Sequence, residues 1–139
     1  MKQFVNKKYT GYLSAFVFIL IVGALLASGD TNKKTVTPIQ TVSSSEFVNL
    51  LADNSNGELL DVRTQEEYDS GHIKGAINID FRGPDFISKI GELDKSKTYF
   101  VYCRSGNRSA SAVEIMKENG FNNIVELEGG IVSAPQLLY

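Results

Sequence analysis

The sequence predicts an α/β domain with a mostly parallel central sheet flanked by helices, and three observations predict it. Short apolar runs alternate with segments of helical periodicity from residue 43 onward, which is typical of parallel sheets. About 95–100 residues are available for this domain, enough to bury one modest core. The single cysteine, Cys103, directly follows an apolar run, and ligands of parallel sheets bind at the carboxyl ends of their strands.

The first half of the domain is predicted to alternate helix, strand, helix and strand. Ser43 and Glu46 have the spacing of a capping box, and apolar residues follow at helical spacing. Residues 59–62 form a short apolar run typical of a strand. Residues 65–70 predict a short helix that a glycine ends, and residues 76–79 predict a second strand.

The second half repeats this alternation around the cysteine. Residues 86–90 predict a helix with one apolar face that includes Ile87. Residues 98–102 are rich in aromatic and β-branched side chains and predict the strand that leads to Cys103. A helical pattern over residues 110–119 follows, and residues 123–127 predict the last strand.

Residues 103–109, Cys-Arg-Ser-Gly-Asn-Arg-Ser, are predicted to form a reactive loop at a helix N-terminus. Inward backbone N–H groups and a helix dipole of about half a positive charge favour an anion there. Arg104 and Arg108 add two positive charges, so the pKa of the Cys103 thiol is expected below the ~8.5 of free cysteine. A lone cysteine is also typical of a small buried hydrophobe, and the arginines also fit a solvated surface turn. The charged, small, glycine-containing neighbours favour the reactive interpretation.

Three stretches resemble rhodanese-type sulfurtransferases. Residues 103–108 match that family's active-site pattern Cys-x-x-Gly-x-Arg, residues 60–79 resemble its other signature, and residues 127–131 resemble its closing segment. The resemblance spans roughly residues 42–133, and the three stretches occur in family order. It implies the small rhodanese-like three-layer fold and a sulfurtransferase activity.

The activity expected from this resemblance is transfer of sulfane sulfur through a persulfide on Cys103. A donor such as thiosulfate would supply the sulfur, and cyanide, a thiol or a protein cysteine would accept it. No cofactor is implied. The residues expected to bind the donor are Arg104, Ser105, Gly106, Asn107, Arg108 and Ser109.

Three alternatives to sulfur transfer fit parts of the same sequence. Phosphatases and arsenate reductases of related fold have five residues between cysteine and arginine, whereas four separate Cys103 from Arg108, which favours a smaller ring of N–H donors. A phosphatase also needs a general acid, for which Asp61 is the nearest candidate. A non-enzymatic binding module and a redox-sensing thiol remain alternatives.

The second signature is expected to support the site rather than perform chemistry. Asp61, Arg63 and His72 are predicted as structural residues near the loop, with Arg63 pairing with Glu66 or Glu67 around a helix N-terminus. His72 is expected to hydrogen-bond backbone groups rather than to serve as a base. Because the chain has no second His or Cys, no metal site is expected.

Residues 1–29 are expected to be a signal peptide or an N-terminal transmembrane anchor. Three lysines precede the apolar run of residues 12–27, which is long for a signal peptide and short for a full membrane span. The domain is therefore expected outside the cytoplasm, either membrane-anchored or periplasmic or extracellular after cleavage. Residues 30–41 are predicted to be a flexible linker, and residues 42–139 the rhodanese-like domain.

The distribution of charge limits the partners that the domain can attract. All 16 acidic residues lie in residues 30–139, whereas three of the 14 basic residues are N-terminal lysines. The domain is therefore net acidic, which excludes a general attraction to nucleic acid and leaves residues 104–108 as a local site for a small anion.

The chain has no Trp, and Pro135 is expected to shorten the last helix.

Overall fold

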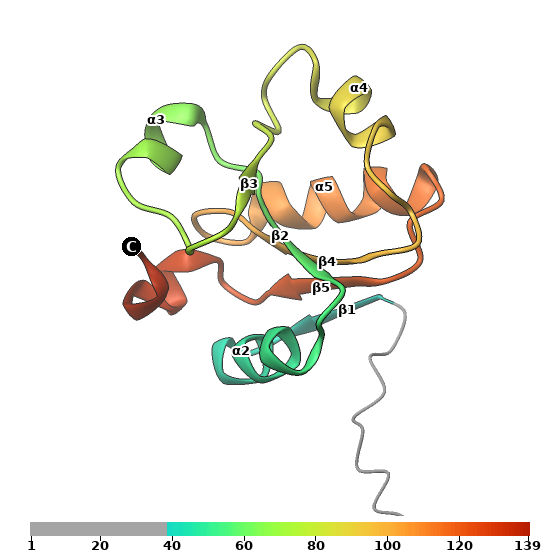
Figure 1. Cartoon of the computed structure of the whole chain (residues 1–139). Helices are drawn as coiled ribbons and strands as arrows, with labels where there is room; N and C mark the ends of the chain where they lie inside the picture. The colour runs from blue at the N-terminus through green and yellow to red at the C-terminus, as the bar shows by residue number, and fades with distance from the viewer. Residues whose placement is uncertain (1–38) are drawn as a thin grey trace, which may run out of the picture. The chain divides into compact units, whose positions relative to one another are not determined.

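The sheet of the computed structural model, which describes residues 39–139, has five strands in the order β1-β5-β4-β2-β3 (Figure 1). Every neighbouring pair of strands is parallel, which confirms the predicted parallel sheet. The strands are β1 (Ile39–Val42), β2 (Gly57–Asp61), β3 (Ile77–Asn78), β4 (Thr98–Tyr102) and β5 (Ile124–Leu127).

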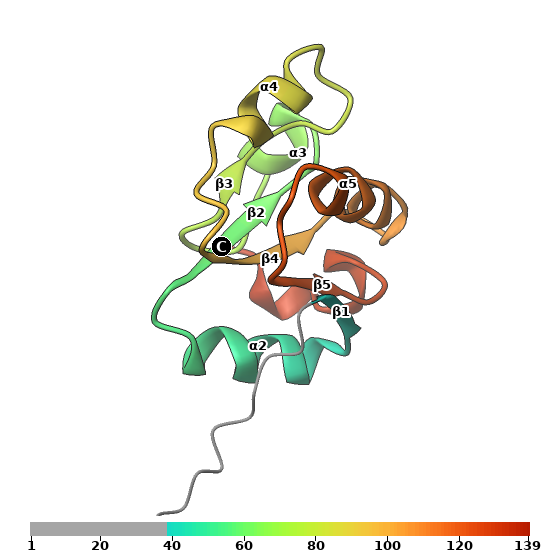
Figure 2. The ribbon, with the colours of Figure 1, turned by 90° about the vertical axis from the view of Figure 1, so that its right-hand side faces the viewer.

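Helices cover both faces of this sheet. The helix α2 lies on one face and the helices α4 and α5 on the other, which gives three layers (Figures 1 and 2). The helices are α2 (Ser44–Asp53), α3 (Gln65–Asp69), α4 (Phe86–Gly91), α5 (Asn107–Glu118) and two 3₁₀ turns, η1 (Ile131–Ser133) and η2 (Pro135–Leu137). The predicted α/β class with flanking helices is confirmed.

The strand β4 joins the two halves of the core, because its side chains alternate between the two faces of the sheet. Tyr99 and Val101 pack toward α5, whereas Phe100 packs toward α2, where its ring meets Phe47 edge-on at 5.4 Å. Cys103, one residue beyond the strand, belongs to the α5 side. The buried strand therefore fixes the position of the cysteine backbone.

The start of α2 agrees with the sequence prediction. The Ser43 hydroxyl accepts the Glu46 N–H at 3.4 Å, as expected of an N-cap. Phe47 and Leu50 are buried on the sheet-facing side of the helix. The cap and the apolar face together determine where this helix begins and how it lies on the sheet.

Two details of the predicted elements are wrong. Ile39–Thr41, expected in the linker, belong to β1, which pairs with β5 from Ile39 to Val42. Backbone pairing to a neighbouring strand stabilises this edge strand although only Val42 of its four side chains is buried. Ile87, expected on the apolar face of α4, is 54% exposed, because one helical turn buries Phe86 and Ile90 instead.

The predicted N-terminal signal peptide or anchor, residues 1–29, lies outside the described residues, as does the predicted linker up to residue 38. Among residues 39–139, none of the helices has the length and apolar composition needed to cross a bilayer.

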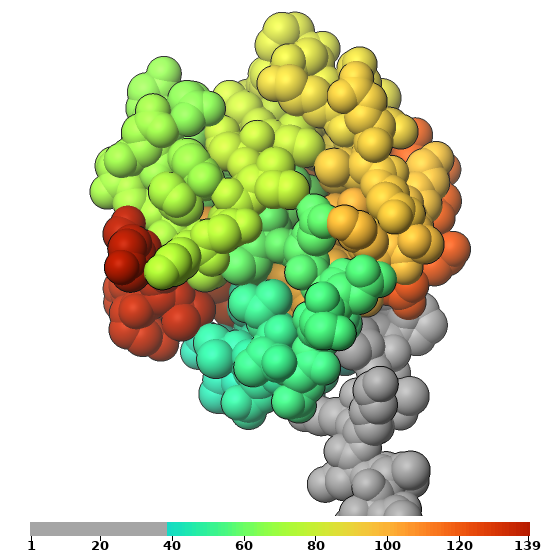
Figure 3. All heavy atoms as spheres, in the orientation of Figure 1, coloured from blue at the N-terminus to red at the C-terminus, as the bar shows by residue number. Residues whose placement is uncertain are grey.

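The C-terminal segment packs beside the residues that follow α3 (Figure 3). The last helices are short, as expected, since η1 and η2 have three residues each, and Pro135 occupies the first turn of η2, where proline is tolerated. The Tyr139 N–H donates to the His72 carbonyl at 2.9 Å, and Leu138 forms an isolated antiparallel bridge with Ile73. These contacts hold the chain end against the domain.

Candidate active site

Cys103 lies at the carboxyl end of β4, in the loop that leads into α5, and is only 1% exposed. The Gly106 N–H donates to its sulfur atom at 3.2 Å. Gly106 is the N-cap of α5 with a φ of +96°, a left-handed conformation that glycine adopts without steric cost. The tight turn lets the chain curl around the sulfur, and α5 starts at Asn107, three residues earlier than predicted.

The surroundings of the sulfur favour its thiolate form. Burial raises the pKa of the Cys103 thiol, but interactions with the Ser109 hydroxyl and with the N–H groups of Ser109, Ser105 and Gly106 lower it. The net effect is a pKa below the usual value. The N-terminus of a 12-residue helix adds its dipole to these donors. The direction of this shift agrees with the lowered pKa expected from the sequence.

Residues that follow β5 hydrogen-bond the backbone of the reactive loop. The Ile131 N–H donates to the Cys103 carbonyl at 2.9 Å, and the Val132 N–H donates to the Arg104 carbonyl at 3.1 Å. Gly130, with φ 62° and ψ −163°, approaches so closely that an added Cβ would lie 2.6 Å from backbone atoms of Arg104 and Cys103. Only glycine fits there, which explains Gly130 physically.

Arg108 forms a bidentate ion pair with Glu67 of α3. Its two terminal nitrogens donate to the carboxylate oxygens of Glu67 at 2.6 and 2.8 Å. This hydrogen bonding is the main cause that lowers the pKa of Glu67 to about 2, and it raises the pKa of Arg108. Glu67 also closes the capping box of α3 with Thr64. The guanidinium predicted to bind the donor is therefore already paired with a carboxylate.

The remaining predicted donor-binding residues differ in their exposure. Arg104, Ser105 and Asn107 are exposed, and Asn107 is the first residue of α5. Ser109 is fully buried in the first turn of the same helix. Residues 103–109 thus come together as one structural unit, with Arg104 as its exposed cation.

Arg63 pairs with Asp61, and the predicted pairing with Glu66 or Glu67 is wrong. The guanidinium donates to both Asp61 oxygens at 2.6–3.0 Å, and its Nη2 also donates to the Gly71 carbonyl at 2.7 Å. Both side chains are buried. The pair ties the end of β2 to the turn after α3, because Gly71 lies in that turn. The expectation that Asp61 and Arg63 have a structural role stays a prediction.

His72 interacts with backbone, as expected. Its Nδ1 lies 3.1 Å from the Tyr68 carbonyl, and its ring stacks on the Tyr68 ring at 3.7 Å. The Tyr68 hydroxyl donates to the Ala76 carbonyl at 2.7 Å. These contacts place His72 in the support of the α3 turn.

A buried carboxylate that was not predicted from the sequence contacts Ser109 of the reactive loop. Glu126 of β5 is 7% exposed, and its Oε1 accepts the Ser109 hydroxyl at 2.7 Å. Its Oε2 accepts the Thr41 hydroxyl of β1 at 3.0 Å. A charged residue in the otherwise apolar strand Ile-Val-Glu-Leu is the sequence feature that marks this position.

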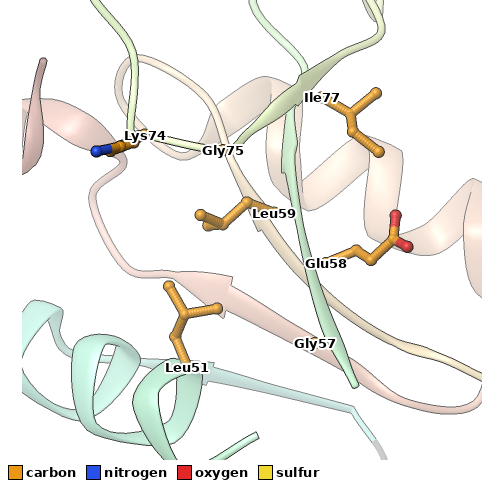
Figure 4. A pocket seen from close by; sticks show the side chains of 7 residues that line it. All are labelled: Leu51, Gly57, Glu58, Leu59, Lys74, Gly75 and Ile77. Carbon is orange, nitrogen blue, oxygen red and sulfur yellow. The ribbon is translucent and has the colours of Figure 1, made fainter. Parts of the chain in front are cut away.

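An open hollow of about 510 Å³ lies at the amino ends of β2 and β3, whereas Cys103 follows the carboxyl end of β4 (Figure 4). Leu51 of α2 and Leu59 of β2 point toward the same side of the hollow, and Ile77 and Glu58 lie to the other side of the strand. None of residues 103–109 lines the hollow. It is therefore separate from the reactive loop.

No cluster of three or more metal-ligating side chains occurs within residues 39–139. The expectation that the protein uses no metal or cofactor stays a prediction.

Comparison with known proteins agrees with this geometry. The family model of the rhodanese-like domain matches residues 43–134. A rhodanese-related protein from Thermoplasma volcanium, 34% identical, superposes with a TM-score of 0.61 over 70% of this chain and 91% of that one. A rhodanese-like domain protein from Staphylococcus aureus, 29% identical, gives a TM-score of 0.60 over 68% of this chain and 90% of that one.

Two longer relatives carry functional names. The tRNA uridine(34) hydroxylase of Buchnera aphidicola is 32% identical over 102 residues, which are 68% of this chain and 31% of that protein. The Bacillus subtilis protein named "Putative sulfur carrier protein YrkF" is 27% identical over 107 residues, 77% of this chain and 57% of that protein. The chain thus spans less than two thirds of either relative.

Proposed function

The chain belongs to the rhodanese-like domain family, and we propose that it is a sulfurtransferase that carries sulfane sulfur as a persulfide on Cys103. The observation that carries the proposal is the position of Cys103 at the start of α5, where the Gly106 N–H donates to its sulfur at 3.2 Å and polar groups of residues 105, 106 and 109 lower its pKa. Such groups stabilise negative charge on sulfur before and after transfer. The name of the Bacillus subtilis relative, a sulfur carrier, supports the same chemistry.

The reaction has two steps, in which Cys103 is the nucleophile. The Cys103 thiolate attacks the outer sulfur of thiosulfate, a new S–S bond forms, and sulfite leaves with the electron pair of the broken S–S bond. The persulfide carries its negative charge on the outer sulfur. An acceptor such as cyanide, a thiol or a protein cysteine then attacks that sulfur, and the Cys103 thiolate is regenerated.

Recognition of the donor's anionic end falls to Arg104 and to the backbone. Arg104 is the exposed cation at the mouth of the loop, whereas Arg108 is paired with Glu67 and acts on the sulfur through space. Backbone N–H groups of residues 104–109 offer fixed donors without a competing carboxylate. A small donor therefore binds mainly through loop geometry, with Arg104 adding attraction.

The structure weakens the phosphatase alternative. Asp61, the candidate general acid, is buried and bonded to Arg63 through both carboxylate oxygens, so it is not free to protonate a leaving group. tRNA modification, the activity in the name of the Buchnera relative, is not part of the proposal, because this domain is net acidic.

The test is a thiosulfate incubation of the full-length chain, followed by mass spectrometry and a thiosulfate–cyanide turnover assay. We expect one added sulfur, about 32 Da, on Cys103 and its loss when cyanide is added. The control variant Cys103→Ser, which keeps the size of the side chain, should show neither the adduct nor turnover. Turnover by that variant would overturn the proposal.

The same preparation separates sulfur transfer from the two remaining alternatives. A redox sensor would react with peroxide faster than with thiosulfate, and its adduct would be an oxygen rather than a sulfur. A non-enzymatic binding module would form neither adduct at a useful rate. Either result with the wild-type chain would replace the proposal.

We further propose that residues 1–29 export the domain as a signal peptide or hold it as an anchor with the domain on the extracytoplasmic side. Basic residues followed by the apolar run of residues 12–27 support this proposal. Cell fractionation with mass determination of the mature N-terminus tests it. Recovery of the uncleaved chain in the cytosolic fraction would contradict both forms of the proposal.

A further inference from the structure

The Glu67 carboxylate occupies the edge of the Arg108 guanidinium that an oxyanion would use. Nη1 and Nη2 of Arg108 donate to Oε2 and Oε1 of Glu67 at 2.6 and 2.8 Å. A guanidinium binds a carboxylate or a phosphate group in this same bidentate geometry. Glu67 therefore fills the position on Arg108 that the anionic end of a donor would otherwise take.

Glu67 is held in that position by its own helix. Its Oε2 accepts the Thr64 N–H at 3.2 Å as well as Nη1 of Arg108, and the Thr64 hydroxyl accepts the Glu67 N–H at 3.3 Å. The side chains of Arg108 and Glu67 are only 15% and 28% exposed. Turning the carboxylate away to admit a ligand would break hydrogen bonds that water could replace only in part.

The fold brings this ion pair to the edge of the sheet where Cys103 lies. The helix α3 follows β2 and the helix α5 follows β4, and these two strands are parallel neighbours. Glu67 lies in the first turn of α3. Arg108 lies in the first turn of α5, two residues after Gly106, whose N–H donates to the Cys103 sulfur at 3.2 Å. The pair is thus anchored beside the nucleophile.

The charges that act on Arg108 are negative. Besides Glu67, Asp80 from the segment after β3 interacts with it electrostatically, and so does Cys103. Arg104 is the exposed cation among residues 103–109. A ligand with one negative charge can be attracted by Arg104, whereas a second negative charge on the ligand finds no uncompensated cation and is repelled by the carboxylates.

We propose that Glu67 determines the donor specificity of the site. By occupying Arg108, it makes the site prefer sulfane-sulfur donors with a single negative charge to dianionic donors and to phosphate-like oxyanions. The inference rests on the proposed function and deepens it, since it names the charge class of the donor. Glu67 touches no reacting atom, so it is a specificity-determining residue that acts through Arg108.

Two donors separate the charge of the ligand from its chemistry. Thiosulfate carries two negative charges, whereas the methanethiosulfonate anion carries one, because a methyl group replaces one oxygen. With either donor the Cys103 thiolate attacks the outer sulfur and a new S–S bond forms. Sulfite or methanesulfinate then leaves with the electron pair of the broken S–S bond. The change in the ratio of the two kcat/KM values between wild type and variant therefore measures selection by charge.

The test compares Glu67→Gln with the matched control Glu66→Gln in the full-length chain. Glu67→Gln keeps the size of the side chain, and glutamine also closes a capping box, so α3 should persist. Glu66 is an exposed residue of the same helix, and the Arg108 guanidinium bonds Glu67 instead. Glu66→Gln therefore removes the same charge from the domain and leaves the ion pair in place.

In Glu67→Gln we expect kcat/KM for thiosulfate to rise about tenfold relative to methanethiosulfonate, as for a charge-assisted hydrogen bond that becomes available to the dianion. In Glu66→Gln the ratio should keep its wild-type value. A ratio that does not change in Glu67→Gln, or that changes equally in both variants, would overturn the proposal.

A second readout needs no sulfur transfer. Bound inorganic phosphate should slow the alkylation of Cys103 by iodoacetamide, which is uncharged, and the ratio of the rates with and without phosphate measures its binding. All samples have the same ionic strength, because exposed cations attract any anion at low salt. We expect phosphate to protect Cys103 at a roughly tenfold lower concentration in Glu67→Gln than in the wild type. Equal protection in Glu67→Gln and Glu66→Gln would count against the proposal and overturn it.

The double variant Glu67→Gln/Arg108→Gln shows whether the effect passes through Arg108. The stronger protection by phosphate should disappear, because no guanidinium remains to be released, and its persistence would overturn the proposal. This variant also serves if Glu67→Gln does not fold, because it leaves no unpaired charge. Protection about tenfold weaker than in the wild type would then mean that Arg108 attracts anions despite Glu67, which contradicts the proposal.

The two readouts separate this inference from the proposed function. A chain that takes sulfur from neither donor but shows stronger phosphate protection in Glu67→Gln would lose the proposed function and keep Glu67 as the residue that controls anion binding. A chain that transfers sulfur with an unchanged donor ratio in Glu67→Gln would keep the proposed function and lose this inference. Unfolding midpoints of each variant identify any loss that comes from misfolding.

Discussion

Gly130→Ala should destabilise the domain and distort the active-site loop by more than a difference in helix or strand propensity would. With φ 62° and ψ −163°, the position lies in a region that is almost restricted to glycine, which costs another residue about 1–3 kcal/mol. The added Cβ would also lie 2.6 Å from the backbone of Cys103 and Arg104, where ordinary contacts begin at 3.4 Å. The segment around Gly130 and the loop at Cys103 and Arg104 must therefore move apart.

That separation would weaken the bonds from Ile131 and Val132 to the Cys103 and Arg104 carbonyls, each contributing about 0.5–1.5 kcal/mol. Backbone strain and weakened bonds together predict a loss of about 2–5 kcal/mol in the free energy of unfolding. The matched control is Gly120→Ala, because Gly120 also has a left-handed φ of +87° but open space around its Cβ position. It should cost about 1–2 kcal/mol.

Urea unfolding followed by circular dichroism measures both losses, and the alkylation rate of Cys103 reports on the loop. We expect a changed alkylation rate in Gly130→Ala and an unchanged rate in Gly120→Ala. If the two variants lose the same stability and both keep the wild-type rate, the closing segment does not hold the loop, and this reasoning is refuted.

Two further predictions concern the ion pairs of the site. Glu67→Gln should destabilise the domain by about 1–2 kcal/mol at pH 7, below the ~3 kcal/mol ceiling set by the lowered pKa of Glu67, because the carboxylate is 28% exposed. Since that pKa is depressed from 4.5 to about 2, the stability difference between wild type and Glu67→Gln should persist above pH 5 and vanish as the pH falls toward 2. Urea midpoints that differ equally at pH 2 and pH 7 would contradict this prediction. Asp61→Asn should cost about 3–5 kcal/mol, because Arg63 would remain buried without its counter-charge. The surface control Asp85→Asn should leave the unfolding midpoint unchanged, and equal midpoints for both variants would refute the structural role of the buried pair.

The sequence predicts those parts of the fold that depend on local pattern. The strand of residues 98–102 is predicted with its observed bounds because it is apolar on both faces, as a central parallel strand must be. The reactive loop is predicted because its residue types and their spacing directly indicate a nucleophilic cysteine among positive charges and backbone N–H donors. By contrast, β1 is an edge strand whose stability comes from pairing with β5, 85 residues further along, so its own four residues carry little pattern.

Partner choice among charged residues is the part that local pattern cannot provide. Arg63, Glu66 and Glu67 are close in sequence, and spacing alone favours a pair among them. The fold instead directs Glu67 to Arg108, 41 residues away, because α3 and the start of α5 both follow carboxyl ends of parallel strands. Arg63 is left to Asp61, the residue two positions before it at the end of β2.

These pairings change how the loop recognises an anion. A motif that shows two arginines suggests two positive charges for the donor, but the Glu67 carboxylate compensates one of them. A donor of the proposed kind would then meet one exposed cation, Arg104, and the backbone and hydroxyl groups that lower the pKa of a buried sulfur. These groups favour charge on the sulfur itself over charge on a bulky oxyanion, because they act on one atom. The compensated arginine thus fits transfer of a single sulfur atom better than binding of a phosphate group.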